Sequence, residues 1–167
     1  MVSNICMVGL LQNYTKTVCK CIADALEMFY ADVRELLEFD LISLAEASKI
    51  VGLDYIEKQE YKKIKTLASY ENTIFTMDYL GLNQEENVVS VKEGSLLVYL
   101  KLSKRLFNQL IKRENLPQSE EILLSSMFKE HNDMLSSVAD VVVEIKTAKD
   151  DLVELVLGRI EEYYENR

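Results

Sequence analysis

A short apolar run that ends in a glycine and leads into an amphipathic segment constrains this chain more than any other feature. Residues 4–8 read Asn-Ile-Cys-Met-Val, Gly9 follows, and residues 18–29 carry apolar side chains at three- and four-residue spacing. Apolar residues without alternation are typical of a parallel strand that is covered on both faces. The stretch therefore predicts a buried strand, a turn and a helix that packs back onto the sheet.

The same pattern recurs along the chain. Further short apolar or β-branched runs, which predict strands, lie at 29–32, 73–76, 96–100 and 141–145. Amphipathic stretches, which predict helices, lie at 33–51 in one or two pieces, 54–70, 103–111, 122–138 and 150–164. Strands that alternate with helices, without a repeat or a linker, predict one α/β domain over residues 1–167 with a five-stranded, mainly parallel sheet.

Three local features carry expectations of their own. Ser43, with Glu46 three residues on, fits the N-cap of a helix. Residues 88–91 are expected to be briefly extended. Residues 112–121 are polar and hold the only proline of the chain, so they are expected to form a loop or lid.

Composition limits the class of partner. The formal net charge of −9 argues against nucleic acid or an anionic membrane, because both require a basic surface. No apolar run approaches the roughly 20 residues of a membrane span, and no signal peptide is recognisable. We therefore expect a cytoplasmic protein whose partner, if it has one, is a second copy or another protein.

The cysteines and the single histidine do not form a recognisable site. Cys6, Cys19 and Cys21 are expected to be reduced thiols, because they are odd in number in a cytosolic protein. His131 has no Cys or His neighbour at metal-ligand spacing, so it is expected to be an exposed helix residue. No metal site is predicted.

The turn after the first strand stands where a phosphate-binding loop would lie. That motif reads G-x-x-x-x-G-K-[ST], since glycines let backbone amides face a phosphate and the lysine neutralises it. If Gly9 opens the motif, its second glycine falls on Tyr14, its lysine on Thr15 and its hydroxyl on Lys16. A slip of one residue restores Lys16 and Thr17 as the lysine–hydroxyl pair, but it displaces the apolar face of the following helix. The sequence therefore predicts a degenerate phosphate loop (Walker A motif).

With its elements in this order, the chain resembles the shikimate kinase family of small P-loop kinases. Residues 17–26, T-V-C-K-C-I-A-D-A-L, resemble the family's T-[VI]-G-R-x-L-A-x-x-L. Residues 98–103, V-Y-L-K-L-S, are similar to its V-[VW]-Y-L-x-[AVT]-S, and residues 138–143 match its A-D-x-V-V strand. The resemblance implies a three-layer α/β/α P-loop kinase-like fold with a central first strand. For an active member, it implies a transferase of aromatic amino acid biosynthesis.

The family's functional residues do not carry over to this chain. Its D-x-D motif on the second strand falls on two apolar residues, its substrate-carboxylate arginine on a glutamate, and its glycine triplet on three larger residues. Its later arginine falls near an asparagine, and its lid motif R-P-L falls on 116–118, which keeps only the proline. The degenerate substrate-binding positions are Ala31, Val33, Glu57, Asp78, Tyr79, Leu80 and Asn132.

The leading hypothesis is a pseudokinase that has lost ATP-dependent phosphoryl transfer and serves in regulation, scaffolding or binding. Phosphoryl transfer depends on positioning and charge neutralisation, and the recognisable groups for both are missing together. No cofactor is expected on this interpretation.

Two other hypotheses remain open. A divergent, active small-molecule kinase would use ATP and Mg²⁺, with Lys16, Thr17 and Asp32 as its candidate residues together with Arg34 or Arg113. In that case Asp32 is expected to face away from the flanking D-x-D positions, since strand side chains alternate. The third hypothesis is an apolar-ligand binder in the vacated cleft, lined by Tyr14, Tyr79 and Leu80.

The sequence also carries a geometric expectation for residues 12–17. Tyr14 occupies a position at which an active loop needs glycine. We therefore expect this loop to be tightened or rearranged and to hold no anion. The Tyr14 ring is expected in or over the former phosphate site, against Tyr79 or Leu80, with a ring turned into solvent as the alternative.

Overall fold

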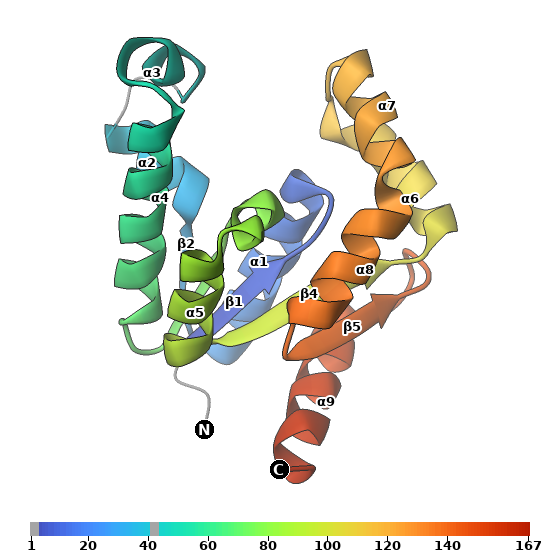
Figure 1. Ribbon diagram of the computed structural model, residues 1–167. Helices are drawn as coiled ribbons and strands as arrows, with labels where there is room; N and C mark the ends of the chain where they lie inside the picture. The colour runs from blue at the N-terminus through green and yellow to red at the C-terminus, as the bar shows by residue number, and fades with distance from the viewer. Residues whose placement is uncertain (1–3, 41–43) are drawn as a thin grey trace.

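A five-stranded parallel sheet lies at the centre of the computed structural model, which describes residues 4–40 and 44–167 (Figure 1). The strands are β1 (Asn4–Val8), β2 (Phe29–Asp32), β3 (Thr73–Thr76), β4 (Leu96–Leu102) and β5 (Val141–Ile145). Their order across the sheet is β2-β3-β1-β4-β5, and every pairing is parallel. The predicted parallel sheet and its central first strand are confirmed. The N-cap expected at Ser43 lies outside the described residues.

Helices cover both faces of this sheet. They are α1 (Gln12–Leu26), α2 (Val33–Asp40), α3 (Leu44–Val51), α4 (Leu53–Ala68), α5 (Glu85–Gly94), α6 (Lys104–Leu110), α7 (Gln118–Ser126), α8 (Phe128–Val138) and α9 (Leu152–Glu165). Two 3₁₀ helices, η1 (Tyr79–Asn83) and η2 (Ile111–Glu114), lie in the connections. α1 and α9 pack together on one face, and α5 and α8 contact β4 from the other, which gives the predicted three layers (Figure 1).

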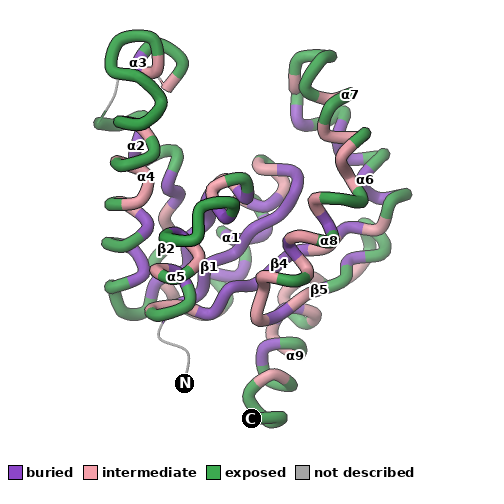
Figure 2. Tube along the Cα trace, in the orientation of Figure 1, coloured by how far each residue is buried: buried purple, intermediate pink, exposed green. Residues whose placement is uncertain are grey.

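The core follows from the burial of the strands on both sides. All five residues of β1 are buried, and large side chains such as Phe75, Leu97 and Tyr99 are fully enclosed in its neighbours. Figure 2 shows this buried centre, with exposed residues gathered on α3, α7 and the outer turns of the other helices. Among the described helices, none is long and apolar enough to cross a bilayer.

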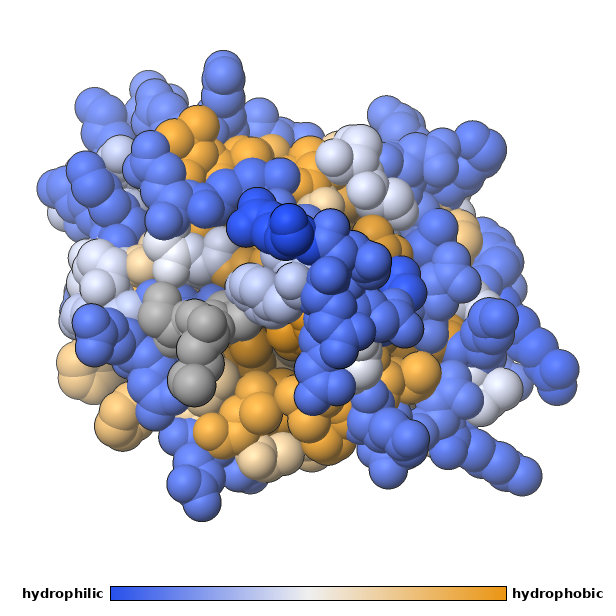
Figure 3. All heavy atoms as spheres, turned by 90° about the horizontal axis from the view of Figure 1, so that it is seen from below, coloured by the Kyte–Doolittle hydropathy of each residue, from blue (hydrophilic) through white to orange (hydrophobic). Residues whose placement is uncertain are grey.

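The two ends of the sheet are covered differently. Seen from the side on which both termini lie, apolar atoms form only patches between charged and polar side chains (Figure 3). At the carboxyl edge, α3 and α7 extend beyond the ends of the strands on opposite sides of the molecule (Figure 1). The edge between them is the place where open α/β sheets bind ligands.

Residues 88–91 were expected to be extended, and this prediction is wrong because they belong to α5. The adjacent valines suggested a strand, yet the buried side chains of this segment, Asn87 and Val91, are four residues apart, which is the spacing of a helix face. Asn87 also donates from Nδ2 to the carbonyl of Gly81, at 2.9 Å, which fixes the start of the helix.

The predicted lid is also helical. Of residues 112–121, the first three belong to η2, and α7 begins directly after Pro117. Proline fits this place, because its fixed φ is suited to a helix start. The helix predicted over 122–138 is divided at Met127 into α7 and α8.

Candidate functional site

A cleft of about 450 Å³ opens at the carboxyl edge of the sheet. Its walls come from the β1–α1 turn, α2, η1, η2 and the α7–α8 pair, so segments that are far apart in the sequence meet there. Most of its lining is apolar. These apolar residues are Leu10, Leu11, Leu80, Leu116, Leu123, Leu124 and Met127. We refer to this space as the carboxyl-edge cleft.

The β1–α1 turn is too short to form a wide phosphate loop. Only three residues, 9–11, separate the strand from α1, which starts at Gln12. The backbone N–H and the Oγ1 of Thr15 both donate to the carbonyl of Leu11, at 2.9 and 2.8 Å. The rearrangement expected for residues 12–17 therefore takes the form of a helix that begins early.

Gly9 is required in this turn by a close contact. A Cβ atom at Gly9 would lie 2.3 Å from the Oγ1 of Thr15, which is buried. Since Oγ1 is held by its hydrogen bond to Leu11, it has little freedom to move away. Gly9 thus allows the strand and the first turn of α1 to approach each other.

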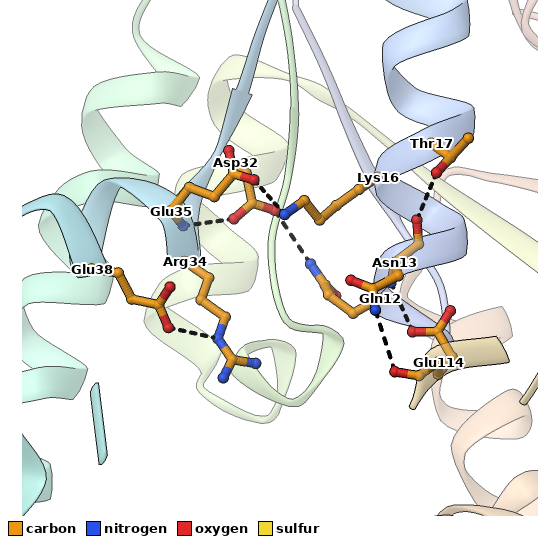
Figure 4. Close-up of polar contacts among 9 residues, drawn as sticks. All are labelled: Gln12, Asn13, Lys16, Thr17, Asp32, Arg34, Glu35, Glu38 and Glu114. Atoms are coloured by element: carbon orange, nitrogen blue, oxygen red, sulfur yellow. Dashed lines mark hydrogen bonds and ion pairs between the residues drawn. The ribbon is translucent and has the colours of Figure 1, made fainter. Parts of the chain in front are cut away.

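The carboxylate of Glu114 binds backbone N–H groups at the start of α1, and Figure 4 shows its contacts with Asn13. The N–H of Asn13 donates to Oε2 and the N–H of Tyr14 donates to Oε1, each at 2.9 Å. Glu114 is only 8 % exposed. The first N–H groups of a helix have no partner within it, and the helix dipole favours an anion at this place. The chain therefore supplies its own anion at the helix end that binds phosphate in P-loop proteins.

Sequence reasoning missed Glu114 as a functional residue. It lies about 100 positions from its hydrogen-bond partners, in the short helix η2, within the segment 112–121 that was predicted to be a loop or lid. No local pattern marks a lone glutamate as the cap of a distant helix, so only the tertiary structure identifies it.

The two candidate catalytic residues, Lys16 and Asp32, lie close together near the starts of α1 and α2 (Figure 4). Lys16 forms an ion pair with Glu35, and its charge also acts on Asp32. Asp32 is 2 % exposed; it accepts from the N–H of Glu35 at 2.7 Å and from the Nε2 of Gln12 at 3.4 Å. Burial raises the pKa of Asp32, while the hydrogen bonds and Lys16 oppose the rise. Asp32 therefore links β2 to the starts of α1 and α2.

The remaining candidates for an active kinase are engaged locally or exposed. The hydroxyl of Thr17 donates to the carbonyl of Asn13 at 3.0 Å, within α1. Arg34 lines the carboxyl-edge cleft and pairs with Glu38 at 3.3 Å. Arg113 is exposed on η2. Lys16 pairs instead with Glu35, so the contacts of these candidates differ from its own.

Tyr79 and His131 form a polar pair in the wall of the cleft. The Tyr79 hydroxyl lies 2.6 Å from Nδ1 of His131, and the two rings meet edge to face with centroids 5.2 Å apart. Burial raises the pKa of Tyr79, so the phenol stays protonated and can donate to Nδ1. His131 lies on a helix, α8, as expected, but its expected exposure is wrong, because it is half-buried and lines the cleft.

Among the degenerate substrate positions, the structure brings Asp78, Tyr79 and Leu80 together in the cleft. Asp78 caps η1 by accepting from the N–H of Leu80 at 2.9 Å. Asn132 is buried and accepts a hydrogen bond from the hydroxyl of Tyr99, which gives it a role in the core.

The other degenerate positions lie elsewhere. Ala31 is half-buried in β2, and Val33 is buried at the start of α2. Glu57 is exposed on α4, beside a separate hollow of about 250 Å³ that also involves Asp54 and Lys58. At Glu57, a carboxylate thus stands at the position where the resemblance implies a cation, and Lys58 lies in the same hollow.

Tyr14 does not take the place expected for it. Its side chain is half-buried, and its pKa is raised by burial and by the charge of Asp150, in the β5–α9 connection. Among the described residues, those that line the cleft include Tyr79 and Leu80 but not Tyr14. The cleft wall expected from Tyr14 is instead supplied by Leu116 and the α7–α8 pair.

The described residues contain no group of three or more His, Cys, Asp or Glu side chains placed to hold a metal ion. The thiols of Cys6 and Cys19 are buried, and burial raises the pKa of both. Cys21 is exposed on α1.

Comparison with known proteins connects this chain to kinases only through its fold. No protein-family model and no curated protein matches the sequence. The shikimate kinase from Acinetobacter baumannii, solved in complex with shikimate, matches with a TM-score of 0.78 at 18% identity, over 100% of this chain and 96% of that one. The shikimate kinase from Bacteroides thetaiotaomicron matches with a TM-score of 0.78 at 15% identity, over 99% of both chains.

A gluconokinase from Sinorhizobium meliloti 1021 is similar as well, with a TM-score of 0.63 at 18% identity, over 99% of this chain and 98% of that one. The predicted resemblance to shikimate kinases is therefore confirmed at the level of the fold, which is the P-loop kinase fold of small-molecule kinases.

Proposed function

We propose that this protein has the shikimate kinase-like fold without ATP-dependent phosphoryl transfer, and that it serves as a binding or regulatory protein. The observation that carries the proposal is the carboxylate of Glu114 on the first N–H groups of α1. These N–H groups are the ones that a phosphate would need, and a carboxylate in hydrogen-bond contact with them repels a second anion.

The charges around the turn also oppose a nucleotide. Catalysis of phosphoryl transfer consists of positioning and of neutralising the charge on the transferred group. Lys16, the cation nearest the turn in the motif alignment, pairs with Glu35 and acts on the buried Asp32. Leu116 stands where the lid motif of the family has an arginine. The residues present do not fit ATP and Mg²⁺.

The test is a titration with Mg-ATP and a coupled assay with shikimate. We expect no heat of binding with ATP at millimolar concentration and no turnover of shikimate, with an active shikimate kinase as the positive control in both. Turnover on the order of 1 s⁻¹, which is ordinary for kinases, would overturn the proposal. Turnover that is a thousandfold slower would leave it standing.

A second candidate is a divergent but active small-molecule kinase. It is favoured by one observation, the meeting of Lys16 and Asp32 at the carboxyl ends of β1 and β2. In that case Lys16→Met would abolish Mg-ATP binding without loss of folding. Lys20→Met, a matched change at an exposed position on the same helix, would leave binding intact.

A further inference from the structure

We propose that the carboxyl-edge cleft binds a small ligand that joins an apolar body to a cationic ammonium head. This inference rests on the proposed function and deepens it, because it names the chemistry that replaces nucleotide and shikimate binding in the same fold.

The size and lining of the cleft suit a small molecule. Its volume of about 450 Å³ falls within the roughly 300–1,000 Å³ of small-molecule sites, which are mostly apolar with a few polar groups. Leu80 on η1 is 46% exposed and Leu123 on α7 is 58% exposed. The two line the same hollow from different elements. An apolar ligand body between them would cover surface that the chain leaves in water.

The charges of the cleft select the head group. Its acidic residues are Asp78, Glu114 and Glu120, and its arginine is Arg34, which already pairs with Glu38. Glu114 is offset by the N–H groups and the dipole of α1. Within the described residues, neither Asp78 nor Glu120 makes an ion pair, so these two carboxylates are left to attract a cation.

Glu60, on α4, is a further acidic residue, and its charge interacts with that of Asp78. Glu60 has its pKa raised to about 7 by burial and by the charges of Asp78 and Glu57. A carboxylate or phosphate ligand in the cleft would meet this repulsion with only Arg34, which is paired with Glu38, to offset it, whereas an ammonium head would relieve it.

Tyr79 and His131 supply the polar contact that would orient the ligand. They are hydrogen-bonded at 2.6 Å and both line the cleft. When the phenol donates to Nδ1, the remaining N–H of the imidazole is on Nε2, and the phenol oxygen keeps acceptor capacity. The wall therefore presents both a donor and an acceptor among leucines, the arrangement by which a mostly apolar site gains specificity.

The first experiment compares three probes with the same apolar body: 4-phenylbutylamine, 4-phenylbutanol and 4-phenylbutyrate. Each is titrated by calorimetry, and binding is located by the signals of ¹³C-methyl-labelled methionine, with Met127 assigned from Met127→Leu. We expect the amine to bind at least tenfold more tightly than the alcohol, the carboxylate to bind weakest, and the Met127 signal to shift. Equal affinities, tighter binding of the carboxylate, or no binding of the amine at millimolar concentration would overturn the inference.

Two pairs of variants test the assignment to this cleft. Leu80→Arg places a bulky cation at its rim and should reduce amine affinity at least tenfold. Val89→Arg, at the equally exposed Val89 on α5, should have no effect. Glu120→Gln should reduce the preference for the amine over the alcohol severalfold, whereas Glu121→Gln on the same helix should preserve it. Equal losses within either pair would contradict the inference.

A parallel titration with Mg-ATP separates this inference from the proposed function. Binding of ATP with the amine preference intact would overturn the proposed function alone. If neither ATP binding nor amine binding is detected, only the ligand assignment is overturned.

Discussion

The carboxyl edge of the sheet has two contrasting ends. At one end the chain supplies the hydrogen-bond partner of a helix start, and at the other it leaves apolar side chains in contact with water. At the start of α1, Glu114 accepts from two backbone N–H groups and is buried against them. Elsewhere in the same cleft, Leu80 of η1 and Leu123 of α7 remain partly in water, and the Tyr79–His131 pair lies in the same wall. We call these the closed end and the open end.

The difference between the two ends has a physical reason. An N–H group at a helix start costs about 1–3 kcal/mol when it is buried without a partner, so an internal carboxylate is strongly stabilising there. An exposed leucine costs only the transfer free energy of its surface, about 25 cal/mol per Å², and folded proteins tolerate much of it. A single internal carboxylate thus satisfies the N–H groups at the start of α1, whereas the apolar side chains of the cleft need no such partner.

The largest effect is expected at the closed end, from Glu114→Ala. The change removes two charge-assisted hydrogen bonds at the start of α1, and we expect the free energy of unfolding to fall by about 3 kcal/mol. Urea denaturation measures it. The exposed Glu120→Ala serves as the control and should stay within about 0.5 kcal/mol of wild type. A loss below that limit at Glu114 would show that its carboxylate does not hold the helix.

Gly9→Ala tests the close approach of the β1–α1 turn to Thr15 at the closed end. Its new Cβ would lie 2.3 Å from the Oγ1 of Thr15, so we expect a loss of about 2 kcal/mol from overpacking. In a Thr15→Ala background the clashing oxygen is absent, and the cost of Gly9→Ala should fall to about half. The double-mutant cycle measures this coupling, and strictly additive losses would contradict the contact.

At the open end, Glu60→Gln is expected to stabilise the protein. Burial and the charges of Asp78 and Glu57 raise the pKa of Glu60 from 4.5 to about 7. A carboxyl group with a raised pKa destabilises the folded state at any pH at which it is ionised. The cost in folding free energy is therefore absent below about pH 4.5, increases between about pH 4.5 and pH 7, and is complete above about pH 7. We expect a gain on the order of 1–2 kcal/mol at pH 8 that shrinks toward pH 5. A gain that does not change with pH would refute this cause.

The smallest effect is expected from Tyr79→Phe, which removes the hydrogen bond to His131 and keeps the ring. We expect the free energy of unfolding to fall by about 1 kcal/mol, the ordinary net value of a hydrogen bond. Tyr70→Phe, at a tyrosine that is 53% exposed, should have no measurable effect. Equal effects of the two changes would indicate that the Tyr79–His131 pair is not formed in solution.

Strands were the elements that the sequence predicted best. The runs at 73–76 and 141–145 coincide with β3 and β5, because a short apolar, β-branched run is by itself typical of a buried strand. The same rule gave a wrong prediction for residues 88–91. These residues include adjacent valines but belong to helix α5, and only the burial of Asn87 and Val91, four residues apart, distinguishes this helix from a strand. The early start of α1 was missed because Gln12 to Thr17 has no apolar periodicity.

The candidate site was predictable only in part. The sequence placed Asp78, Tyr79 and Leu80 together, and the structure brings them to the cleft. It missed His131, which appeared as an isolated histidine although its partner Tyr79 lies 52 positions away. Pairs at such separations leave no local spacing from which to infer them.

By itself, the sequence determined the α/β class, the order of the strands along the chain and the residue types that follow the first strand, Gly9 to Thr17. These are properties of neighbouring residues, and periodicity and residue type express them directly. Only the tertiary structure decided that Glu114 occupies the start of α1 and that the open end keeps its leucines and its Tyr79–His131 pair. Such contacts depend on where the packing of the sheet and helices brings distant segments, and each is a balance of desolvation and hydrogen bonding that no local pattern encodes.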